Sequence, residues 1–322
     1  MAVPKTAFLV TAHDQPLIAR RLLDRLDVPW ARTFVHVDRK VDIRPFRAGY
    51  SGGATFLPDS RRVPVYWGGF SIAQAMLNMI EHALEEMPDL ERVVTLSGVD
   101  YPIRPLAEIG RFFARHPDVE FMRVDRDVNP HRTQIHDWYI RRRFLGDNYY
   151  FNPKSSPVPA LAASARVVAR MFPRTYIPGL QIYHGGCWWS LSRRGLDDLV
   201  GYFRAHPDHL AWFRQARSAV ELVFQTCLKA TPSASRITQD LTIANPRPES
   251  ENPFLHGVHY IDWRAGGPHP KNLTLDDLAA LRASPALFAR KTHSSVSLPL
   301  LDRLDEEDTA PYARRAALSA VG

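Results

Sequence analysis

The stretch TAFLVTAHDQP, residues 6–16, decides the fold class. Its first seven residues, Thr6–Ala12, form the short apolar run that is typical of a buried strand. His13 and Asp14 end this run, and Pro16 lies where the first turn of a helix tolerates proline. A strand followed at once by a helix predicts a βα unit of an α/β domain.

The same order continues along the chain. Further strands are predicted at Thr33–Val37, Arg92–Leu96 and Cys187–Leu191, and helices at Ser71–Glu86, Leu106–Phe113, Arg194–Phe203 and Ser218–Lys229. This alternation predicts a Rossmann-like, mostly parallel sheet flanked by helices on both faces. Ligands of such sheets bind beyond the carboxyl ends of the strands, so we expect His13, Asp38 and Asp100 on one rim.

Composition excludes several classes of protein. There is no run of about 18 apolar residues, so no membrane span is expected. The two cysteines, Cys187 and Cys227, lack CxxC spacing and are too few for a disulfide framework, which favours buried reduced thiols. A net charge of +7 indicates either a solvated basic surface or attraction to an anionic ligand, such as a nucleotide diphosphate or a phospholipid-linked acceptor. No basic stripe interleaved with aromatics is present, so nucleic acid is not an expected partner.

Two predicted strands end in a carboxylate. Asp38, in the segment His36–Arg39, can accept hydrogen bonds from a uracil or a ribose, or it can cap a turn. Asp100 follows the third strand in LSGVDYP, where an Asx turn is the other interpretation. Many sugar-nucleotide enzymes hold Mn²⁺ with an Asp-x-Asp at this position. A single Asp predicts that no metal is bound.

Glu221 has two interpretations. The segment Ser218–Glu221 matches a capping box, in which the serine and the glutamate bond to the backbone of the first helical turn. The other possibility is that Glu221 faces a cleft and takes a proton from an acceptor hydroxyl. Spacing alone favours the cap.

The C-terminal third supplies cations. HYIDWR at residues 259–264 leads through a glycine-rich turn to PHPK at 268–271, and LFARK follows at 287–291. Without a metal, a departing diphosphate needs such fixed positive charges. The alternative is an exposed basic region without that role.

Taken together and in order, eight segments resemble the core-2/I-branching β-1,6-N-acetylglucosaminyltransferase and peptide O-xylosyltransferase family, glycosyltransferase family 14. They are VTAHDQP, FVHVDRK, VYWGGFSIAQAMLNMI, RVVTLSGVDYPIRPLAEI, HGGCWWSLSRR, SAVELVFQTCL, YIDWRAGGPHPK and SPALFARK. Four of these segments contain WGG, LSGVDYPIR, AVELVFQTCL and LFARK. These four are more similar to the xylosyltransferase branch. The resemblance covers roughly residues 6–302.

The resemblance implies a GT-A fold, a UDP-sugar donor, inversion at the anomeric carbon and no divalent cation or other cofactor. It also implies roles for residues at matching positions. Asp38, beside Val10 and Arg39, would contact the uracil or the ribose, and Lys291 would bind the diphosphate. Glu221 would be the general base, and Asp100 would lie near the transferred sugar and acceptor. Asp100 is also the second candidate for the base. A diphosphate arginine is assigned first to Arg264, with His259 as second choice. Trp67, Trp188 and Trp189 can stack on sugar faces, or simply pack in the core.

Departures from the family pattern limit what transfers. The eukaryotic members are cysteine-rich Golgi membrane proteins, whereas this chain shows no anchor, so we expect a cytoplasmic protein or one peripheral at the inner membrane face. Where the xylosyltransferases have GGSDW, this chain has Gly185–Trp189 with Trp188 in place of an acceptor-side Asp, which weighs against a proteoglycan-like peptide acceptor.

The predicted organisation is one GT-A domain over residues 1–302, with a nucleotide-binding half at about 1–125, an acceptor-side half at about 126–302 and a tail at 303–322. The predicted function is transfer of N-acetylglucosamine or xylose from a UDP-sugar to a hydroxyl of a glycan or other acceptor, lipid-linked acceptors included. The alternatives are a non-catalytic nucleotide-sugar or carbohydrate-binding protein with a decayed site, and a retaining or metal-dependent GT-A enzyme.

Overall fold

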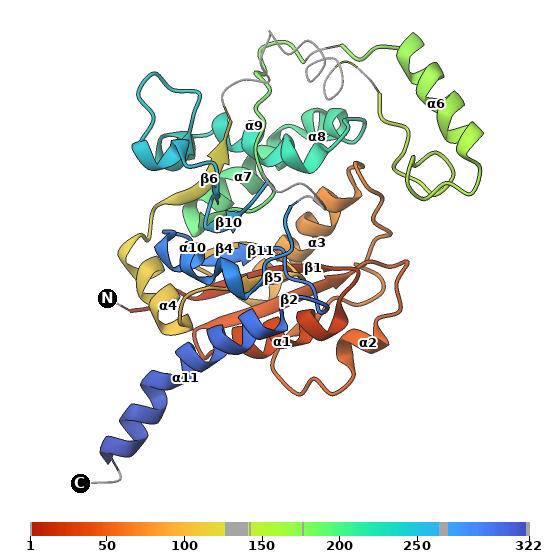
Figure 1. Ribbon diagram of the computed structural model, residues 1–322. Helices are drawn as coiled ribbons and strands as arrows, with labels where there is room; N and C mark the ends of the chain where they lie inside the picture. Colours follow the sequence, from red (N-terminus) through yellow and green to blue (C-terminus); the bar gives the residue numbers. More distant parts are fainter. Residues whose placement is uncertain (1, 126–140, 142, 176, 264–269, 320–322) are drawn as a thin grey trace.

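The computed structural model describes residues 2–125, 141, 143–175, 177–263 and 270–319, and within them the chain is an α/β protein with two sheets (Figure 1). The larger sheet has the strand order β3-β2-β1-β4-β7-β6-β8. Its strands are β1 (Thr6–Ala12), β2 (Ala31–Val37), β3 (Thr55–Phe56), β4 (Arg92–Ser97), β6 (Glu120–Val124), β7 (Ser190–Ser192) and β8 (Ile237–Asp240). The four strands β1 to β4 are parallel, and β7 runs antiparallel to its neighbours β4 and β6. The predicted α/β class with a mostly parallel sheet is confirmed.

Helices cover both faces of this sheet, as predicted. The helices of the described residues are α1 (Pro16–Leu26), α2 (Arg44–Arg47), α3 (Ser71–Glu86), α4 (Leu106–Arg115), α6 (Pro159–Met171), α7 (Arg193–Ala205), α8 (Pro207–Phe213), α9 (Val223–Lys229), α10 (Leu278–Ala283) and α11 (Leu298–Ser319), with short 3-10 segments η2 (Ala219–Glu221), η3 (Pro232–Arg236), η4 (Pro248–Glu251) and η5 (Leu275–Asp277). Side chains of β1 alternate between two cores: Phe8 and Val10 pack with α1, α4 and α11, and Ala7 and Leu9 pack with α3, α7 and α9. In the described ranges, no helix has the length and apolar character needed to cross a bilayer.

The smaller sheet brings distant segments together. Its order is β5 (Asp100–Pro102), β11 (Phe288–Arg290), β10 (His259–Ile261) and β9 (Leu255–His256). Asp100 lies opposite Arg290 in the β5–β11 pairing, and β10 is the next strand beyond β11. The C-terminal segments therefore lie beside the end of β4, in the centre of the protein.

Three expectations from the sequence are corrected. The strand predicted from Cys187 begins only at Ser190, because residues 184–189 have no strand partner. The helix predicted over Ser218–Lys229 is broken into η2 and α9. The capping box is wrong: Ser218 has a left-handed φ of 49°, its side chain makes no capping hydrogen bond, and its N–H bonds to the Gly68 carbonyl at 2.7 Å.

The helix α11 continues past residue 302 to Ser319 (Figure 1). Acidic residues near its start pair with two arginines of α1. Arg21 lies 2.7 Å from Asp302, and Arg25 lies 2.5 Å from Asp305 and 3.1 Å from Asp308. These ion pairs hold the start of α11 against α1.

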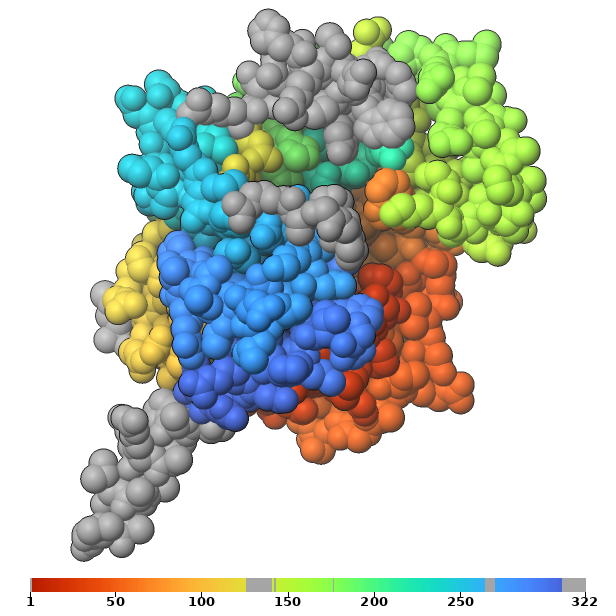
Figure 2. Space-filling model, viewed as in Figure 1, coloured from red at the N-terminus to blue at the C-terminus, as the bar shows by residue number. Residues whose placement is uncertain are grey.

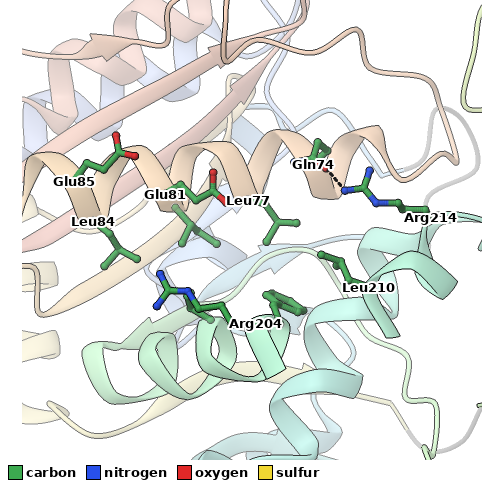
Figure 3. Close-up of a pocket in the computed structure, with 11 residues that line it drawn as sticks. Gln74, Leu77, Glu81, Leu84, Glu85, Arg204, Leu210 and Arg214 are labelled. Carbon is green, nitrogen blue, oxygen red and sulfur yellow. Dashed lines mark hydrogen bonds between the residues drawn. The ribbon is translucent and has the colours of Figure 1, made fainter. Parts of the chain in front are cut away.

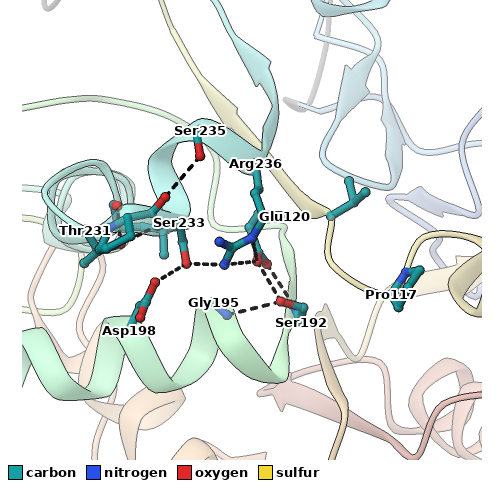
Figure 4. A network of polar contacts seen from close by, with 12 residues as sticks. Pro117, Glu120, Ser192, Gly195, Asp198, Thr231, Ser233, Ser235 and Arg236 are labelled. Atoms are coloured by element: carbon teal, nitrogen blue, oxygen red, sulfur yellow. Dashed lines mark hydrogen bonds and ion pairs between the residues drawn. The ribbon is translucent and has the colours of Figure 1, made fainter.

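A buried polar network fixes β6 against α7 and η3 (Figure 4). The fully buried carboxylate of Glu120 accepts hydrogen bonds from the Ser192 N–H at 2.8 Å and hydroxyl at 2.6 Å, and it pairs with Arg236 at 3.1 Å. A Cβ atom added to Gly195 would lie 2.5 Å from the Glu120 carboxylate. Only glycine fits at this position of α7 without moving the network.

Candidate active site

The candidate site lies beyond the carboxyl ends of the parallel strands, where ligands of such sheets bind. Asp38 follows β2, and its carboxylate accepts hydrogen bonds from the backbone N–H groups of Lys40 at 2.9 Å and Val65 at 3.1 Å. The Lys40 ammonium lies 2.7 Å from the other carboxylate oxygen. Asp38 therefore organises the loop at this rim, and the exposed Arg39 lies beside it.

Two aromatic residues, Tyr66 and Trp67, directly follow Val65 in the chain. Lys40 lies 4.7 Å from the centre of the Tyr66 ring, and Trp67 is 46% exposed. Lys154 and Arg217 approach the Trp67 ring at 3.9 and 5.1 Å. An exposed indole with two cations beside it is an aromatic surface of the kind on which a sugar or a base can stack.

Glu221 is connected to the loop that carries Trp67 through Ser218, three residues earlier in the chain, whose N–H donates to the Gly68 carbonyl. The Glu221 side chain is 36% exposed, and its Oε2 lies 3.5 Å from Nε2 of His184. The other ring nitrogen of His184 lies 3.0 Å from Oδ2 of Asp125, and Arg123 lies 2.7 Å from Oδ1. The four side chains form one chain of alternating charge.

This arrangement changes two pKa values. Burial alone lowers the pKa of the His184 imidazole, but the hydrogen bonds and charges of Asp125 and Glu221 outweigh it and raise that pKa to about 9. Burial raises the pKa of the Asp125 carboxyl, but His184 and Arg123 outweigh it and lower that pKa to about 2. At neutral pH, Glu221 therefore faces an imidazolium cation whose other side is held by a carboxylate.

A second cluster surrounds Asp100, which is fully buried. Its oxygens accept hydrogen bonds from the Ser97 N–H at 2.7 Å and the Ser97 hydroxyl at 2.6 Å. Arg290 and His259 each lie 3.5 Å from the carboxylate, and Arg290 also lies 4.2 Å from the centre of the Trp188 ring. Burial raises the pKa of Asp100, but Arg290, His259 and Ser97 outweigh it and lower that pKa.

His259 is enclosed as well. Its ring is fully buried and stacks on Phe288 with 5.4 Å between the ring centres. Burial is the largest cause of its lowered pKa, and the nearby Arg290 lowers it further, while Asp100 opposes both. A neutral buried imidazole differs from the exposed cation expected of a diphosphate ligand.

The segment between His184 and Trp188 lies between the two clusters. The pKa of the partly buried Cys187 thiol is raised to about 12, mainly by burial, with Arg290 opposing it and both Glu221 and Asp100 adding to it. The side chain of Gln225 donates to the Gly186 carbonyl at 2.6 Å, which fixes this segment on α9. The two clusters are therefore neighbouring parts of one region.

The remaining sequence-predicted residues have different surroundings. Lys291 follows β11, is partly exposed, and in the described part of the chain its ammonium has no ion-pair partner. Val10 and Trp189 are fully buried in the two cores, where neither side chain can touch a ligand. Arg264 lies outside the described residues.

Sequence reasoning missed Asp125 and His184 as site residues, and it offered Arg290 only as a substitute for Lys291. Asp125 comes directly after β6, so the same strand-end argument that selected Asp38 could have found it. No comparable signal marks His184, because it faces Asp125 and Glu221 only in the folded chain. Arg290 stands next to Lys291 in LFARK, and only the β5–β11 pairing shows that it contacts Asp100.

Two other features lie apart from these clusters. Within the described ranges, His206, Asp208 and His209 form a group of side chains that could hold a metal ion, at the junction of α7 and α8. A groove of about 430 Å³ lies between α3 and the helices α7 and α8, with Leu77, Leu84 and Leu210 on its walls (Figure 3). None of the sequence-predicted site residues lines this groove.

Comparison with known sequences decides the family. A sequence model of the Core-2/I-Branching enzyme family matches residues 6–282. The chain belongs to this family. The resemblance stated from the eight segments is thereby confirmed.

Curated relatives match over nearly the whole chain. It is 25% identical to "Xylosyltransferase oxt" of Drosophila melanogaster over 97% of this chain and 34% of that protein. It is 25% identical to "Beta-glucuronosyltransferase GlcAT14A" of Arabidopsis thaliana, covering 94% of this chain and 64% of that one. It is 23% identical to "Probable beta-1,3-galactosyl-O-glycosyl-glycoprotein beta-1,6-N-acetylglucosaminyltransferase 7" of Homo sapiens, covering 96% and 69%. The chain spans about a third of the length of the xylosyltransferases it matches.

Proposed function

We propose that this protein is an inverting, metal-independent glycosyltransferase of the GT-A type. In this proposal it transfers N-acetylglucosamine or xylose from a UDP-sugar to a hydroxyl of a glycan or another acceptor. Family membership supports sugar transfer, because the named relatives are a xylosyltransferase, a glucuronosyltransferase and an N-acetylglucosaminyltransferase. The strand-end position of Asp38 supports a nucleotide at this rim of the sheet.

The observation that carries the proposal is the setting of Glu221. A general base must reach the substrate proton and must be ionised when the substrate binds. Glu221 is 36% exposed, and its Oε2 lies 3.5 Å from the His184 imidazolium, which holds the carboxylate in place. Asp100, the other candidate, is fully buried and hydrogen-bonded to Ser97, so an acceptor hydroxyl does not reach its carboxylate. In this proposal, Asp100 positions the Arg290 side chain and stabilises the pairing of β5 with β11.

The proposed step is one in-line displacement. The acceptor oxygen attacks the anomeric carbon, its proton passes to Glu221, and the bond from that carbon to the diphosphate oxygen breaks with its electron pair leaving on UDP. Lys291, whose ammonium is unpaired within the described residues, stabilises the charge that grows on the diphosphate. Arg264 remains the proposed arginine partner, and Arg290 is preferred to His259 as its alternative, because His259 is enclosed and its pKa is lowered.

Metal independence is proposed from the ligands at the end of β4. This segment carries one carboxylate, Asp100, which is fully buried and bonded to Ser97 through each of its oxygens. A divalent cation on a diphosphate requires free oxygen ligands from the protein. Fixed cations from β11 and the following segment can neutralise the leaving group in its place.

A two-part experiment tests the proposal. UDP is titrated into the protein by calorimetry with Mn²⁺ and with EDTA, and UDP release is measured with UDP-N-acetylglucosamine, UDP-xylose and UDP-glucuronic acid, each with and without simple sugar acceptors. Equal UDP affinity in both buffers, with acceptor-stimulated release from a donor, supports the proposal. A large gain in affinity with Mn²⁺ contradicts metal independence. UDP binding without release from any donor favours the non-catalytic alternative.

A further inference from the structure

Exposed apolar side chains concentrate in one part of the described chain. Fifteen large hydrophobic residues are exposed in the whole described part of the chain. Nine of these fifteen lie between residues 145 and 172: Leu145, Tyr149, Tyr150, Val158, Leu161, Val167, Val168, Met171 and Phe172. Figure 2 shows this segment as a projecting lobe at the upper right, and Figure 1 shows that α6 is its helix. Scattered exposed hydrophobics need no explanation, but a cluster marks an interaction surface.

The helix α6 has two distinct faces. Ala162, Ala165 and Ala169 form its buried face. The opposite side presents Val167, Val168 and Met171, the last of them 69% exposed, and Phe172 follows directly at 61%. Val167 and Val168 lie four and three residues before Met171, so both neighbour Met171 on this side of the helix. An α-helix of 13 residues with this pattern is amphipathic, with its apolar side turned to solvent.

The charge of the segment shows what kind of partner fits. Residues 143–175 hold five basic side chains and one acidic side chain, so about a tenth of the chain carries +4 of the net charge of +7. Arg166 and Arg170 are exposed one turn apart on α6, and in the described residues neither has an ion-pair partner. Free cations beside an apolar strip match the surface of an anionic bilayer, where phosphate groups lie next to acyl chains.

We propose that α6 and the residues that flank it dock this protein onto an anionic lipid bilayer. The apolar side chains from Val167 to Phe172 enter the boundary between headgroups and acyl chains, and Arg166 and Arg170 pair with lipid phosphates. The helix lies in the plane of the surface and does not cross it. This docking is independent of the catalytic proposal, because it uses none of the side chains assigned to sugar transfer.

Vesicle flotation with the full chain tests the proposal. Phosphatidylcholine vesicles are compared with vesicles that contain about 30% phosphatidylglycerol, at low and at high salt, because attraction to anionic headgroups is screened by salt. We expect the wild-type protein to float with the anionic vesicles and to be released from them by salt. Absence of binding to the anionic vesicles overturns the proposal.

Matched variants separate the local surface from the overall charge. The double variant Arg166→Glu with Arg170→Glu should lose at least about tenfold in bound fraction, because each basic residue at such a surface contributes about fivefold. Arg111→Glu with Arg115→Glu, on α4, makes the same change in net charge at two exposed arginines with the same spacing, and should stay near wild type. Equal loss in both double variants overturns the proposal, because binding would then follow net charge alone.

The apolar contribution has its own pair of variants. Val168→Glu with Phe172→Glu should abolish flotation, whereas Ile243→Glu, at an exposed residue outside this lobe, should not. Circular dichroism and thermal melting check that each variant is folded.

A second copy of the chain is the competing occupant of this face. A dimer in sedimentation equilibrium that Phe172→Glu dissociates, together with no vesicle binding, would overturn the proposal in favour of self-association.

Discussion

His184 and Glu221 form an ion pair in which Nε2 of the histidine lies 3.5 Å from Oε2 of the glutamate. Asp125 holds the opposite side of the same ring at 3.0 Å. The histidine therefore has a carboxylate on each side, and its pKa of about 9 keeps it charged at neutral pH. Glu221 is thereby oriented while part of its side chain stays open to solvent. Five predictions follow from this pair, from Lys291 and from the network around Glu120.

Glu221→Gln should lower sugar transfer by roughly 10²–10⁴, because an amide cannot accept the acceptor proton. UDP affinity should stay near that of the wild type, since Glu221 acts on the acceptor. Turnover with the best donor and UDP titration by calorimetry measure the two effects on one variant. Glu108→Gln, at an exposed carboxylate on α4, is the matched control. Transfer that survives Glu221→Gln would remove Glu221 as the base.

His184→Gln should lower transfer by roughly tenfold or more, by analogy with residues that orient ligands in metal sites. It should also change the pH profile. In the wild type, transfer should decline as the pH rises through about 9, because the imidazolium opposite Glu221 is then lost. The variant should lack this alkaline decline, whereas His116→Gln should keep it. A wild-type rate that is flat from pH 8 to about pH 10 would contradict this role.

The same pair should make stability depend on pH. The folded pKa of His184, about 9, lies above the ordinary value of 6.5, so the charged histidine stabilises the fold most fully below about pH 6.5. This contribution is lost as the pH rises through about 9. Denaturant unfolding of the wild type and of His184→Gln should therefore differ more at pH 6 than at pH 10. A difference that does not depend on pH would show that His184 is not charged in the folded protein.

Lys291→Ala should reduce turnover by roughly a hundredfold, because it removes one fixed charge that stabilises the leaving diphosphate. The melting temperature should change little, since the ammonium has no ion-pair partner in the described part of the chain. Lys5→Ala, at an exposed lysine at the start of β1, is the control for loss of one positive charge. If Lys291→Ala stays active, the leaving-group role passes to Arg290 or Arg264.

Two glycines of α7 should respond to alanine with opposite signs. Gly195→Ala places a Cβ 2.5 Å from the locked carboxylate of Glu120 and should cost about 1–3 kcal/mol of unfolding free energy, as overpacking does. Gly201→Ala meets no atom within 4 Å and should stabilise the helix by about 0.5–1 kcal/mol. Chemical denaturation of both variants checks the pair. Destabilisation by both changes would mean that α7 does not tolerate alanine for another reason.

The sequence by itself determined the regular elements of the first half of the chain. β1 at Thr6–Ala12 and α3 at Ser71–Glu86 have the predicted limits, because apolar periodicity records which face of each element is buried. It also placed Asp38 and Asp100 after β2 and β4. The eight segments were sufficient to identify the family, and the match over residues 6–282 agrees with them.

Only the tertiary structure decided how these residues are used. Ser218 and Glu221 have the spacing of a capping box, but the bond from the Ser218 N–H to Gly68 holds Ser218 in a left-handed conformation. Glu221 was the first candidate for the base and Asp100 the second, and burial separates them. The pairing of Asp125 with His184 joins residues 59 positions apart. Local sequence encodes periodicity and turn preference, whereas burial and charge at a site arise from contacts between distant segments, and no pattern within one segment records those contacts.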